Sequence, residues 1–534
     1  MSRAPSFILF VADQLRADFL GCYGHPVVRT PHLDGIASRG TLFERCYVAS
    51  PVCMPNRASL MTGRMPSVHG VRCNGIALSS QAVTFVELLA DAGYRTGLVG
   101  KSHLQNFTGL PRMFPPADFA GIGNGRAPVG PLSQALRDHG TGPAYQMESP
   151  QRWAGRSPSV DTPFYGFGHV ELVTSHGDEV GGDYRTWLRA KDPTAEARLM
   201  GPANALAHDY ECPQAHRTAM PVELYPTHYI AERAGAWLRS EAHDPQQPFF
   251  LMVSFPDPHH PFNPPGHYWD MYQPDQFLTP AAFGHPDWQP PPHVTAMIRA
   301  RAEGRADTGT QAAFACSARE AREAQALTAG MITCLDDAIG EVLLALGEAG
   351  RADDTVLMFT ADHGDYLGDH QLLLKGAAQY DTITRVPLLW SDPAAPRDAA
   401  REPALAQTID IPMTILARAG LAAYAGIQGI DLLPVIEQRG AGREDVLIQF
   451  DSQRQLPGTQ ITVRTHTLRH QSWRLSRMEG VDWGELYDLA SDPGELHNLW
   501  DDPAMRDVRS MLIERMVRVE MAHLDRVPLA TSLA

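Results

Sequence analysis

Short apolar runs alternate with amphipathic segments along the first hundred residues of the chain. The runs 7–12 and 95–99 have the length and composition of buried strands. Between them, Thr84 and Glu87 have the spacing of a capping box, which predicts a helix over residues 85–92. Strands that alternate with helices are typical of a mostly parallel sheet with helices on its faces. We therefore predict an α/β fold.

The same pattern returns in the middle of the chain. Apolar runs 249–254 and 355–360 predict two more buried strands, and helical periodicity spans residues 227–238 and about 318–346. The stretch 105–218, by contrast, is rich in Pro, Gly, His and aromatic residues and has no sustained period. Because ordinary loops are far shorter, we predict an elaborated insertion here, which could cover a site or contact another subunit of a homo-oligomer.

A smaller unit with a different pattern follows the larger one. Strand-like segments at 446–450 and 460–463 precede a helical pattern over about 504–524. A chain of 534 residues is long for one domain, so two are expected. The predicted units are a large α/β domain over residues 1–442 and a smaller α+β subdomain over residues 443–534.

Composition and charge narrow the function classes. The chain is 44% hydrophobic and 20% charged, as in ordinary globular proteins, and its formal net charge is −16. This negative charge argues against nucleic acid and anionic membranes as partners. An anionic small-molecule substrate would have to bind at a local positive site, because the overall field repels it.

The cysteines and the apolar runs bear on the compartment. Seven cysteines are scattered along the chain, an odd number without the paired spacing of metal sites. The first apolar run halts at Asp13, too early for a signal sequence, and no later segment approaches the length of a membrane span. We therefore expect reduced thiols in a cytoplasmic protein, with export by an unrecognised route as the alternative.

One short segment around Cys53 concentrates candidate chemistry. Pro55 suits a first helical turn and Gly63 suits the position after a helix, so we predict a helix over about 55–62. Cys53 would then lie at the helix N-terminus, with Arg57 one turn further on. Free N–H groups and the helix dipole there favour an anion beside the sulfur and would acidify the thiol. The alternative is that Cys53 is a small buried hydrophobic residue.

Two of the predicted strands end in acidic and polar side chains. Asp13 and Gln14 follow the run 7–12, and Asp362 and His363 follow shortly after the run that ends at residue 360. In open α/β sheets, ligands collect at the carboxyl ends of the strands. A mostly oxygen set suits Ca²⁺, Mg²⁺ or Mn²⁺, and an imidazole moves the preference toward Mn²⁺. Taken singly, an aspartate after a strand is more often a helix cap.

Basic side chains occupy similar positions. Lys101 and His103 follow one predicted strand, His259 follows another, and Lys375 lies among apolar residues. A lone lysine is more often a surface residue whose stem covers apolar neighbours, and a lone loop histidine is more often bonded to the backbone. Together with Arg57, however, these groups could surround an oxyanion and protonate a departing oxygen.

Several of these segments resemble the signature motifs of the sulfatase family, within the alkaline phosphatase superfamily. The most specific is Cys-x-Pro-x-Arg at residues 53–57 with the following Ala-Ser-Leu-Met-Thr-Gly-Arg. Gly-Lys-x-His at Lys101, Pro-His-x-Pro-Phe at His259 and residues 484–499 are also similar to motifs of that family. The resemblance implies an alkaline-phosphatase-like, mostly parallel sheet in the large domain, which would be catalytic.

The candidate metal ligands depart from the commonest family pattern. Many sulfatases carry two consecutive aspartates and an Asp-Asn pair, where this chain has Asp13-Gln14 and Asp362-His363. Gln14 and His363 resemble the branch that contains choline sulfatases and phosphonate monoester hydrolases. The resemblance implies one divalent metal ion, Ca²⁺ or Mn²⁺, on these four residues and leaves its identity open.

The resemblance also implies a modified nucleophile. In sulfatases a modifying enzyme oxidises the cysteine to formylglycine, an aldehyde whose hydrate attacks the ester. Carried over to this sequence, Cys53 would be the modified residue and Arg57 its supporting cation. Release of the product anion from the second hydroxyl restores the aldehyde, so no second displacement by water is needed.

Family roles for the remaining basic residues follow in the same way. The resemblance implies that Lys375 and His259 bind the substrate and stabilise or protonate the leaving oxygen. His103 would take the proton from the second hydroxyl, with support from Lys101, which would also bind substrate. Asn74 could hydrogen-bond the substrate, although an Asn-Gly pair is more often only a turn.

The leading hypothesis is a hydrolase of aryl or other small sulfate monoesters. The first alternative is a phosphonate monoester or phosphodiester hydrolase with the same nucleophile. Because both substrate classes fit one site, we also expect a sulfatase of this kind to be promiscuous toward phosphonate monoesters and phosphodiesters. Lys101 and His103 favour sulfate, because related phosphonate hydrolases tend to carry uncharged hydroxyl residues there. The second alternative is a non-catalytic metal- or anion-binding protein on a decayed fold.

Overall fold

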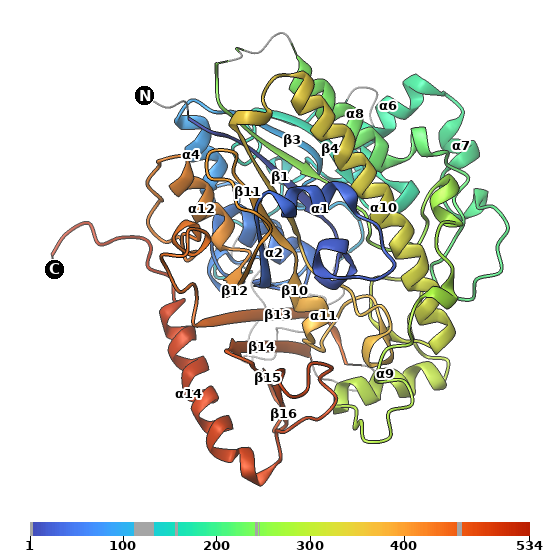
Figure 1. Ribbon diagram of the computed structural model, residues 1–534, viewed down its shortest axis with the longest axis vertical. Helices are drawn as coiled ribbons and strands as arrows, with labels where there is room; N and C mark the ends of the chain where they lie inside the picture. The colour runs from blue at the N-terminus through green and yellow to red at the C-terminus, as the bar shows by residue number, and fades with distance from the viewer. Residues whose placement is uncertain are drawn as a thin grey trace.

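A ten-stranded mixed sheet runs through the larger part of the protein in the computed structural model, which describes residues 4–111, 133–154, 158–240, 244, 246–456 and 462–533 (Figure 1). The strand order is β10-β2-β11-β8-β1-β6-β3-β4-β5, and β12 pairs with β2. The strands are β1 (Ser6–Ala12), β2 (Thr41–Tyr47), β3 (Arg95–Lys101), β4 (His169–Thr174), β5 (Gly181–Gly182), β6 (Phe249–Ser254), β8 (Thr355–Ala361), β10 (Arg385–Val386), β11 (Leu388–Ser391) and β12 (Ala400–Gln407).

Five neighbouring strands, β8-β1-β6-β3-β4, are parallel and form the centre of the sheet. Every residue of β1, β6 and β8 is buried. A parallel sheet covered on both faces needs such uninterrupted apolar strands, which explains why these three were readable in the sequence. Their carboxyl ends lie along one edge of the sheet.

Helices cover both faces of this sheet. Adjacent residues of a strand point to opposite faces. Phe249 of β6 packs against Trp237 of α8 with ring centroids 5.6 Å apart, and Phe250 packs against Phe85 of α4 at 5.1 Å. The helices of the large domain are α1 (Pro31–Ser38), α2 (Cys53–Thr62), α3 (Pro66–His69), α4 (Phe85–Asp91), α5 (Pro150–Trp153), α6 (Asp183–Lys191), α7 (Ala195–Leu199), α8 (Pro226–Arg239), α9 (Pro292–Ala302), α10 (Ala318–Glu348), α11 (Asp381–Thr384), α12 (Asp410–Arg418) and α13 (Leu433–Ile436).

Most predicted elements of the large domain are confirmed. The capping box of Thr84 and Glu87 is present at the start of α4. The predicted strand 249–254 coincides with β6. The predicted helix 318–346 is α10, which continues to Glu348. The short strands β7 (Phe314–Ala315) and β9 (Leu372–Leu373) form a separate two-stranded sheet that was not predicted.

The stretch 105–218 is only partly the irregular insertion that its composition indicated. It contains β4 and β5, and β4 pairs in parallel with β3 as part of the main sheet. The three residues His169, Val170 and Glu171 at the start of β4 are only partly buried. Such a strand mixes polar and apolar residues, so it lacks the continuous apolar run that revealed its neighbours.

The C-terminal unit is an antiparallel four-stranded sheet with one long helix beside it (Figure 1). Its strands are β13 (Asp445–Gln455), β14 (Thr462–His470), β15 (Trp473–Met478) and β16 (Gly484–Asp488), and its helix is α14 (Arg506–Ala522). The first part of the predicted strand 460–463 lies outside the described residues. Leu447, Leu468 and Leu512 belong to one apolar cluster, which holds the sheet to the helix. No helix in the described part of the chain has the length and apolar character to cross a membrane.

Candidate active site

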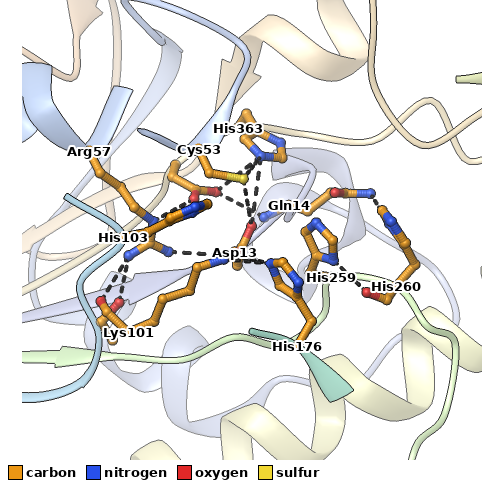
Figure 2. Close-up of polar contacts among 12 residues, drawn as sticks. Asp13, Gln14, Cys53, Arg57, Lys101, His103, His176, His259, His260 and His363 are labelled. Atoms are coloured by element: carbon orange, nitrogen blue, oxygen red, sulfur yellow. Dashed lines mark hydrogen bonds and ion pairs between the residues drawn. The ribbon is translucent and has the colours of Figure 1, made fainter. Parts of the chain in front are cut away.

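Polar side chains at the carboxyl ends of the parallel strands lie close together and form one cluster (Figure 2). Asp13 directly follows β1, Asp362 directly follows β8, and Lys101 is the last residue of β3. His259 follows β6 and His176 follows β4 after short turns. Each of these five side chains is at least 93% buried, so they form a cluster with little contact with water.

Cys53 reaches this cluster from the N-terminus of α2, of which it is the first residue. Its Sγ lies 3.1 Å from His363 Nε2 and 3.7 Å from Asp13 Oδ1. Gly63 follows the helix with a left-handed backbone (φ 61°), as the sequence predicted. The helix begins at residue 53 instead of 55, which brings the sulfur directly to its end.

The expectation that the helix N-terminus acidifies the Cys53 thiol is wrong. Burial, and then the nearby carboxylate of Asp13, raises the pKa of this thiol to about 11. Lys375 and Lys101 oppose the shift without overcoming it. The unmodified side chain is therefore a protonated thiol at neutral pH, which is a poor nucleophile.

Three of the four predicted metal ligands lie together. Ligand atoms of Asp13, Asp362 and His363 lie within 4.8 Å of one another and of the Cys53 sulfur. The two carboxylates suit a hard divalent cation such as Ca²⁺ or Mn²⁺, and the imidazole moves the preference toward Mn²⁺. The chemistry of the donor set thus agrees with the predicted ion.

Gln14 lies beside this group with its side chain engaged elsewhere. Its Oε1 accepts a hydrogen bond from Lys375 Nζ at 2.6 Å, and its Nε2 donates to Asp365 and lies 3.2 Å from His260 Nδ1. The backbone N–H of Gln14 donates to Asp362 Oδ1 at 3.0 Å. Gln14 as a direct metal ligand therefore remains a prediction.

Two cations neutralise the carboxylates. Arg57 Nε donates to Asp362 Oδ2 at 2.7 Å, and Lys101 forms an ion pair with Asp13. Burial opposes ionisation of Asp13, yet Lys101, His259 and Arg57 together hold its pKa well below the usual range. Nη2 of Arg57 is buried, and among the described residues it has no hydrogen-bond partner. It is a donor available to an oxyanion beside Cys53.

A second basic group lies on the other side of Asp13. Lys375 Nζ is 2.8 Å from His259 Nε2, and the His259 ring stacks on His176 with centroids 3.5 Å apart. His176 Nε2 in turn lies 2.7 Å from Lys101 Nζ. His176 therefore connects the two lysines of the site through His259. Burial, and then Lys101, lowers its pKa to about 3, so it is a neutral acceptor for Lys101.

His176 is the site residue that sequence reasoning missed. It falls in the stretch 105–218, where the strand before it was not recognised. The signal that could have found it is the rule that located Asp13 and Asp362, namely a polar residue just after a parallel strand.

Asn74 and His103 lie at the wall of a cavity next to Cys53. Oδ1 of Asn74 accepts a hydrogen bond from the backbone N–H of Met54 at 3.0 Å, so it supports the start of α2. Substrate binding by Asn74 remains a prediction. His103 stacks on Phe107 with ring centroids 3.8 Å apart.

The cavity has a volume of about 1290 Å³, larger than most single-ligand sites. Much of its wall is apolar, with Phe107, Met297, Phe314 and Phe450 from four separate segments. Residues of the stretch 105–218 and of the segment 264–310 both line the cavity. The C-terminal unit also contributes through Phe450 and the end of β13, which was not expected.

Comparison with known proteins places this site in a family. The sulfatase family profile matches residues 5–421. The chain belongs to the sulfatase family. A second profile, described as the C-terminal part of N-sulphoglucosamine sulphohydrolase, matches residues 368–522. The match confirms the predicted enzyme class, a sulfuric ester hydrolase, and the structure confirms the predicted fold, a mostly parallel central sheet with a smaller C-terminal α+β unit.

Similar proteins include both sulfate and phosphonate hydrolases. An arylsulfatase of Clostridium perfringens is 27% identical over 98% of this sulfatase and 96% of its own length. A multifunctional alkaline phosphatase superfamily protein of Trinickia caryophylli is 26% identical, covering 97% and 96%. The solved structure of a phosphonate monoester hydrolase of Agrobacterium radiobacter superposes with a TM-score of 0.76 at 25% identity, covering 99% and 98%.

Proposed function

We propose that this sulfatase hydrolyses sulfate monoesters of aryl or similarly apolar alcohols, with residue 53 as the nucleophile after its conversion to formylglycine. The observation that carries the proposal is the position of Cys53, whose Sγ lies 3.1 Å from His363 and 3.7 Å from Asp13. As a hydrated aldehyde, residue 53 would supply a hydroxyl nucleophile in place of the thiol.

The modification also constrains when its enzyme acts. Cys53 is 0% exposed, at the base of a closed cluster. A modifying enzyme therefore has to reach the segment before the chain folds. The modifying enzyme would recognise the residues from Pro55 to Arg57 in the unfolded chain, before they form part of α2.

The metal ion belongs with Asp13, Asp362 and His363, and Gln14 is the fourth predicted ligand. When bound, Ca²⁺ or Mn²⁺ would supply positive charge to the developing oxyanion. Arg57 adds to this charge through its Nη2, which lies 3.8 Å from Asp13 Oδ2 and makes no hydrogen bond to a described residue. The local excess of positive charge would draw in a sulfate ester that the overall charge of the protein repels.

The leaving group would be handled on the opposite side. His259 and Lys375 share a hydrogen bond of 2.8 Å, so a proton can pass between them to the departing oxygen. His103 is assigned the opposite task of removing a proton when the product anion leaves residue 53. Lys101 and His176 would hold the charge of the sulfate between these two groups. The apolar cavity next to Lys375 would receive the alcohol portion of the ester.

Phosphonate monoesters and phosphodiesters are the second candidate substrate class. The presence of Gln14 and His363 and the phosphonate monoester hydrolase among the similar structures favour it. Lys101 and His103 favour sulfate, because related phosphonate hydrolases tend to carry uncharged hydroxyl residues at these positions. A decayed, non-catalytic protein is disfavoured, since each role has a competent residue in the cluster.

The test is a comparison of kcat/KM for an aryl sulfate and an aryl phosphonate monoester with the same leaving group. The proposal predicts that the sulfate is preferred. A phosphonate preference greater than about tenfold, which corresponds to about 1.4 kcal/mol in transition-state binding, would reverse the order of the two substrate classes.

A further inference from the structure

The turn that carries His103 is held by one buried carboxylate. The backbone N–H groups of His103, Leu104 and Gln105 all donate to Glu148, at 2.8, 2.9 and 3.0 Å. Glu148 is 0% exposed, and no ion pair joins it to a basic residue in the described part of the chain. The three converging N–H groups are therefore its main partners, and they oppose burial, which still raises the pKa of Glu148 to about 7.

The conformation of this turn needs such support. His103 has φ 55°, in the left-handed region that residues with a side chain seldom adopt. A residue held there costs roughly 1–3 kcal/mol unless its surroundings fix it. The Glu148 bonds fix the backbone on both sides of the His103 side chain, and the ring of Phe107 stacks against the imidazole at 3.8 Å.

The same few residues of the stretch 105–218 hold the turn at a second point. Oε1 of Gln105 accepts from the N–H of Met147 at 2.9 Å, and its Nε2 donates to the carbonyl of Ala144 at 2.8 Å. The segment 144–148 thus holds the turn through hydrogen bonds to its backbone N–H groups and to the side chain of Gln105. This gives part of the irregular stretch a role that its composition did not reveal.

We propose that Glu148 is a positioning residue that sets the His103 imidazole for its reaction step by clamping the N–H groups of residues 103–105. The proposal rests on the proposed function for the task of His103, but the clamp itself is independent of it. Both oxygens of the carboxylate accept hydrogen bonds, so a group with only one acceptor oxygen cannot replace it.

The decisive variant is Glu148→Gln, which keeps the size of the side chain and replaces one acceptor oxygen by an NH₂ donor. We expect faster hydrogen exchange at the amides of residues 103–105. We also expect a fall in kcat of about 10- to 100-fold with little change in KM, because a misplacement near 1 Å has that effect. In a His103→Ala background the same change should have no further effect on kcat.

A control is available in α10, where Glu323 pairs with Arg319. Glu323 is also buried and accepts two backbone N–H groups, from Glu211 and Cys212, each at 2.8 Å. It is outside the catalytic cluster. Glu323→Gln should change hydrogen exchange at residues 211–212 and leave kcat unchanged.

Three results would overturn the proposal: unchanged exchange at residues 103–105, an equal loss of kcat in the Glu323→Gln control, or a full additional loss in the His103→Ala background. Should Glu148→Gln fail to fold, Glu148→Asp is measured in its place. Its shorter side chain keeps both oxygens but moves them away from the three N–H groups, so the same changes in exchange and kcat are expected. If the protein turned over neither ester, the proposed function would fail, and the exchange measurement would still decide whether the clamp exists.

Discussion

Two buried ionic clusters in this protein differ in one instructive respect. Around Cys53, the carboxylates of Asp13 and Asp362 pair with Lys101 and Arg57. A third cation, Lys375, contacts His259, and the cluster borders a large cavity. Beneath the C-terminal sheet, Arg474 pairs with two carboxylates, Glu485 at 2.8 Å and Glu495.

The second cluster is enclosed by aromatic rings. The Arg474 guanidinium lies 5.2 Å and 4.5 Å from the ring centres of Tyr380 and Tyr487. Its side chain is fully buried, like that of Arg57, and both arginines have raised pKa values that their carboxylate partners support against burial. Burial and shifted pKa therefore do not distinguish an active site from a structural ion pair. An excess of positive charge, a reactive side chain and a cavity do.

Removing the reactive side chain should give the largest difference between the clusters. Cys53→Ala is expected to lower kcat for an aryl sulfate by at least about 10³-fold, as removal of a covalent nucleophile does elsewhere. The melting temperature should change little, because only one sulfur is lost. Steady-state kinetics and thermal unfolding check both expectations, and full turnover by the variant would refute the nucleophile assignment.

Removing a cation from the active cluster should depend on the leaving group. Lys375→Ala is expected to lower kcat about 10²- to 10³-fold for esters of weakly acidic alcohols, because protonation of the departing oxygen is impaired. Esters of strongly acidic phenols need little protonation and should be affected much less. A series of aryl sulfates measures this dependence. An equal loss across the series would remove Lys375 from the leaving-group side.

Breaking the enclosed cluster should affect stability instead of catalysis. Arg474→Met leaves Glu485 and Glu495 buried without their partner, so we expect the free energy of unfolding to fall by about 3–5 kcal/mol. Denaturant titration measures the loss, and kcat of the folded fraction should stay within a factor of about two. Arg518→Met, on the exposed face of α14, is the control and should change stability by less than about 0.5 kcal/mol.

His176 tests how far the active cluster extends. His176→Ala removes the acceptor for Lys101 and the ring that stacks on His259, so we expect kcat/KM to fall about tenfold. His176→Asn can restore an acceptor and should recover part of the loss. If both variants keep wild-type kcat/KM, the His176 contacts are only structural.

A pH dependence of stability is expected in the enclosed cluster. Burial lowers the pKa of His370, which stacks on Tyr380, to about 4. The unfolded chain binds a proton at this histidine near pH 6.5 and the folded chain does not, so stability falls as the pH drops from about 6.5 to 4. The slope approaches about 1.4 kcal/mol per pH unit.

Glu495 acts in the opposite direction, because burial raises its pKa to about 7 and the folded chain takes up the proton first. The difference between wild type and His370→Gln isolates the histidine. Relative to its value at pH 7, the unfolding free energy at pH 5 should be higher in the variant than in the wild type, because the destabilising protonation of His370 is removed while that of Glu495 remains. An identical pH dependence would show that His370 is protonated in the folded protein.

The sequence predicted those parts of the site that depend on strand ends. Asp13, Asp362 and Lys101 follow strands that are buried on both faces, and such strands appear as continuous apolar runs. His176 follows a strand with partly exposed residues, so its own position could not be recognised. Helix-cap signals placed Cys53 at the start of α2 because capping depends on a few adjacent residues.

Other features of the site depend on contacts between distant segments, which periodicity does not report. The pKa of Cys53 depends on its burial and on Asp13, 40 residues away, and the local helix signal gave the wrong direction. Glu148 lies in a segment without a recognisable period, and its three N–H partners are at least 43 residues distant. Phe450 enters the cavity wall only because the C-terminal sheet packs beside the large domain.

The central claim is that residue 53 acts as formylglycine beside Asp13 and His363. Mass spectrometry of the peptide that contains this residue, in protein purified from its own cells, tests the claim directly. The account predicts a peptide about 18 Da lighter than the cysteine form, as expected when a thiol becomes an aldehyde. An unmodified cysteine in protein that fully hydrolyses aryl sulfates would contradict it.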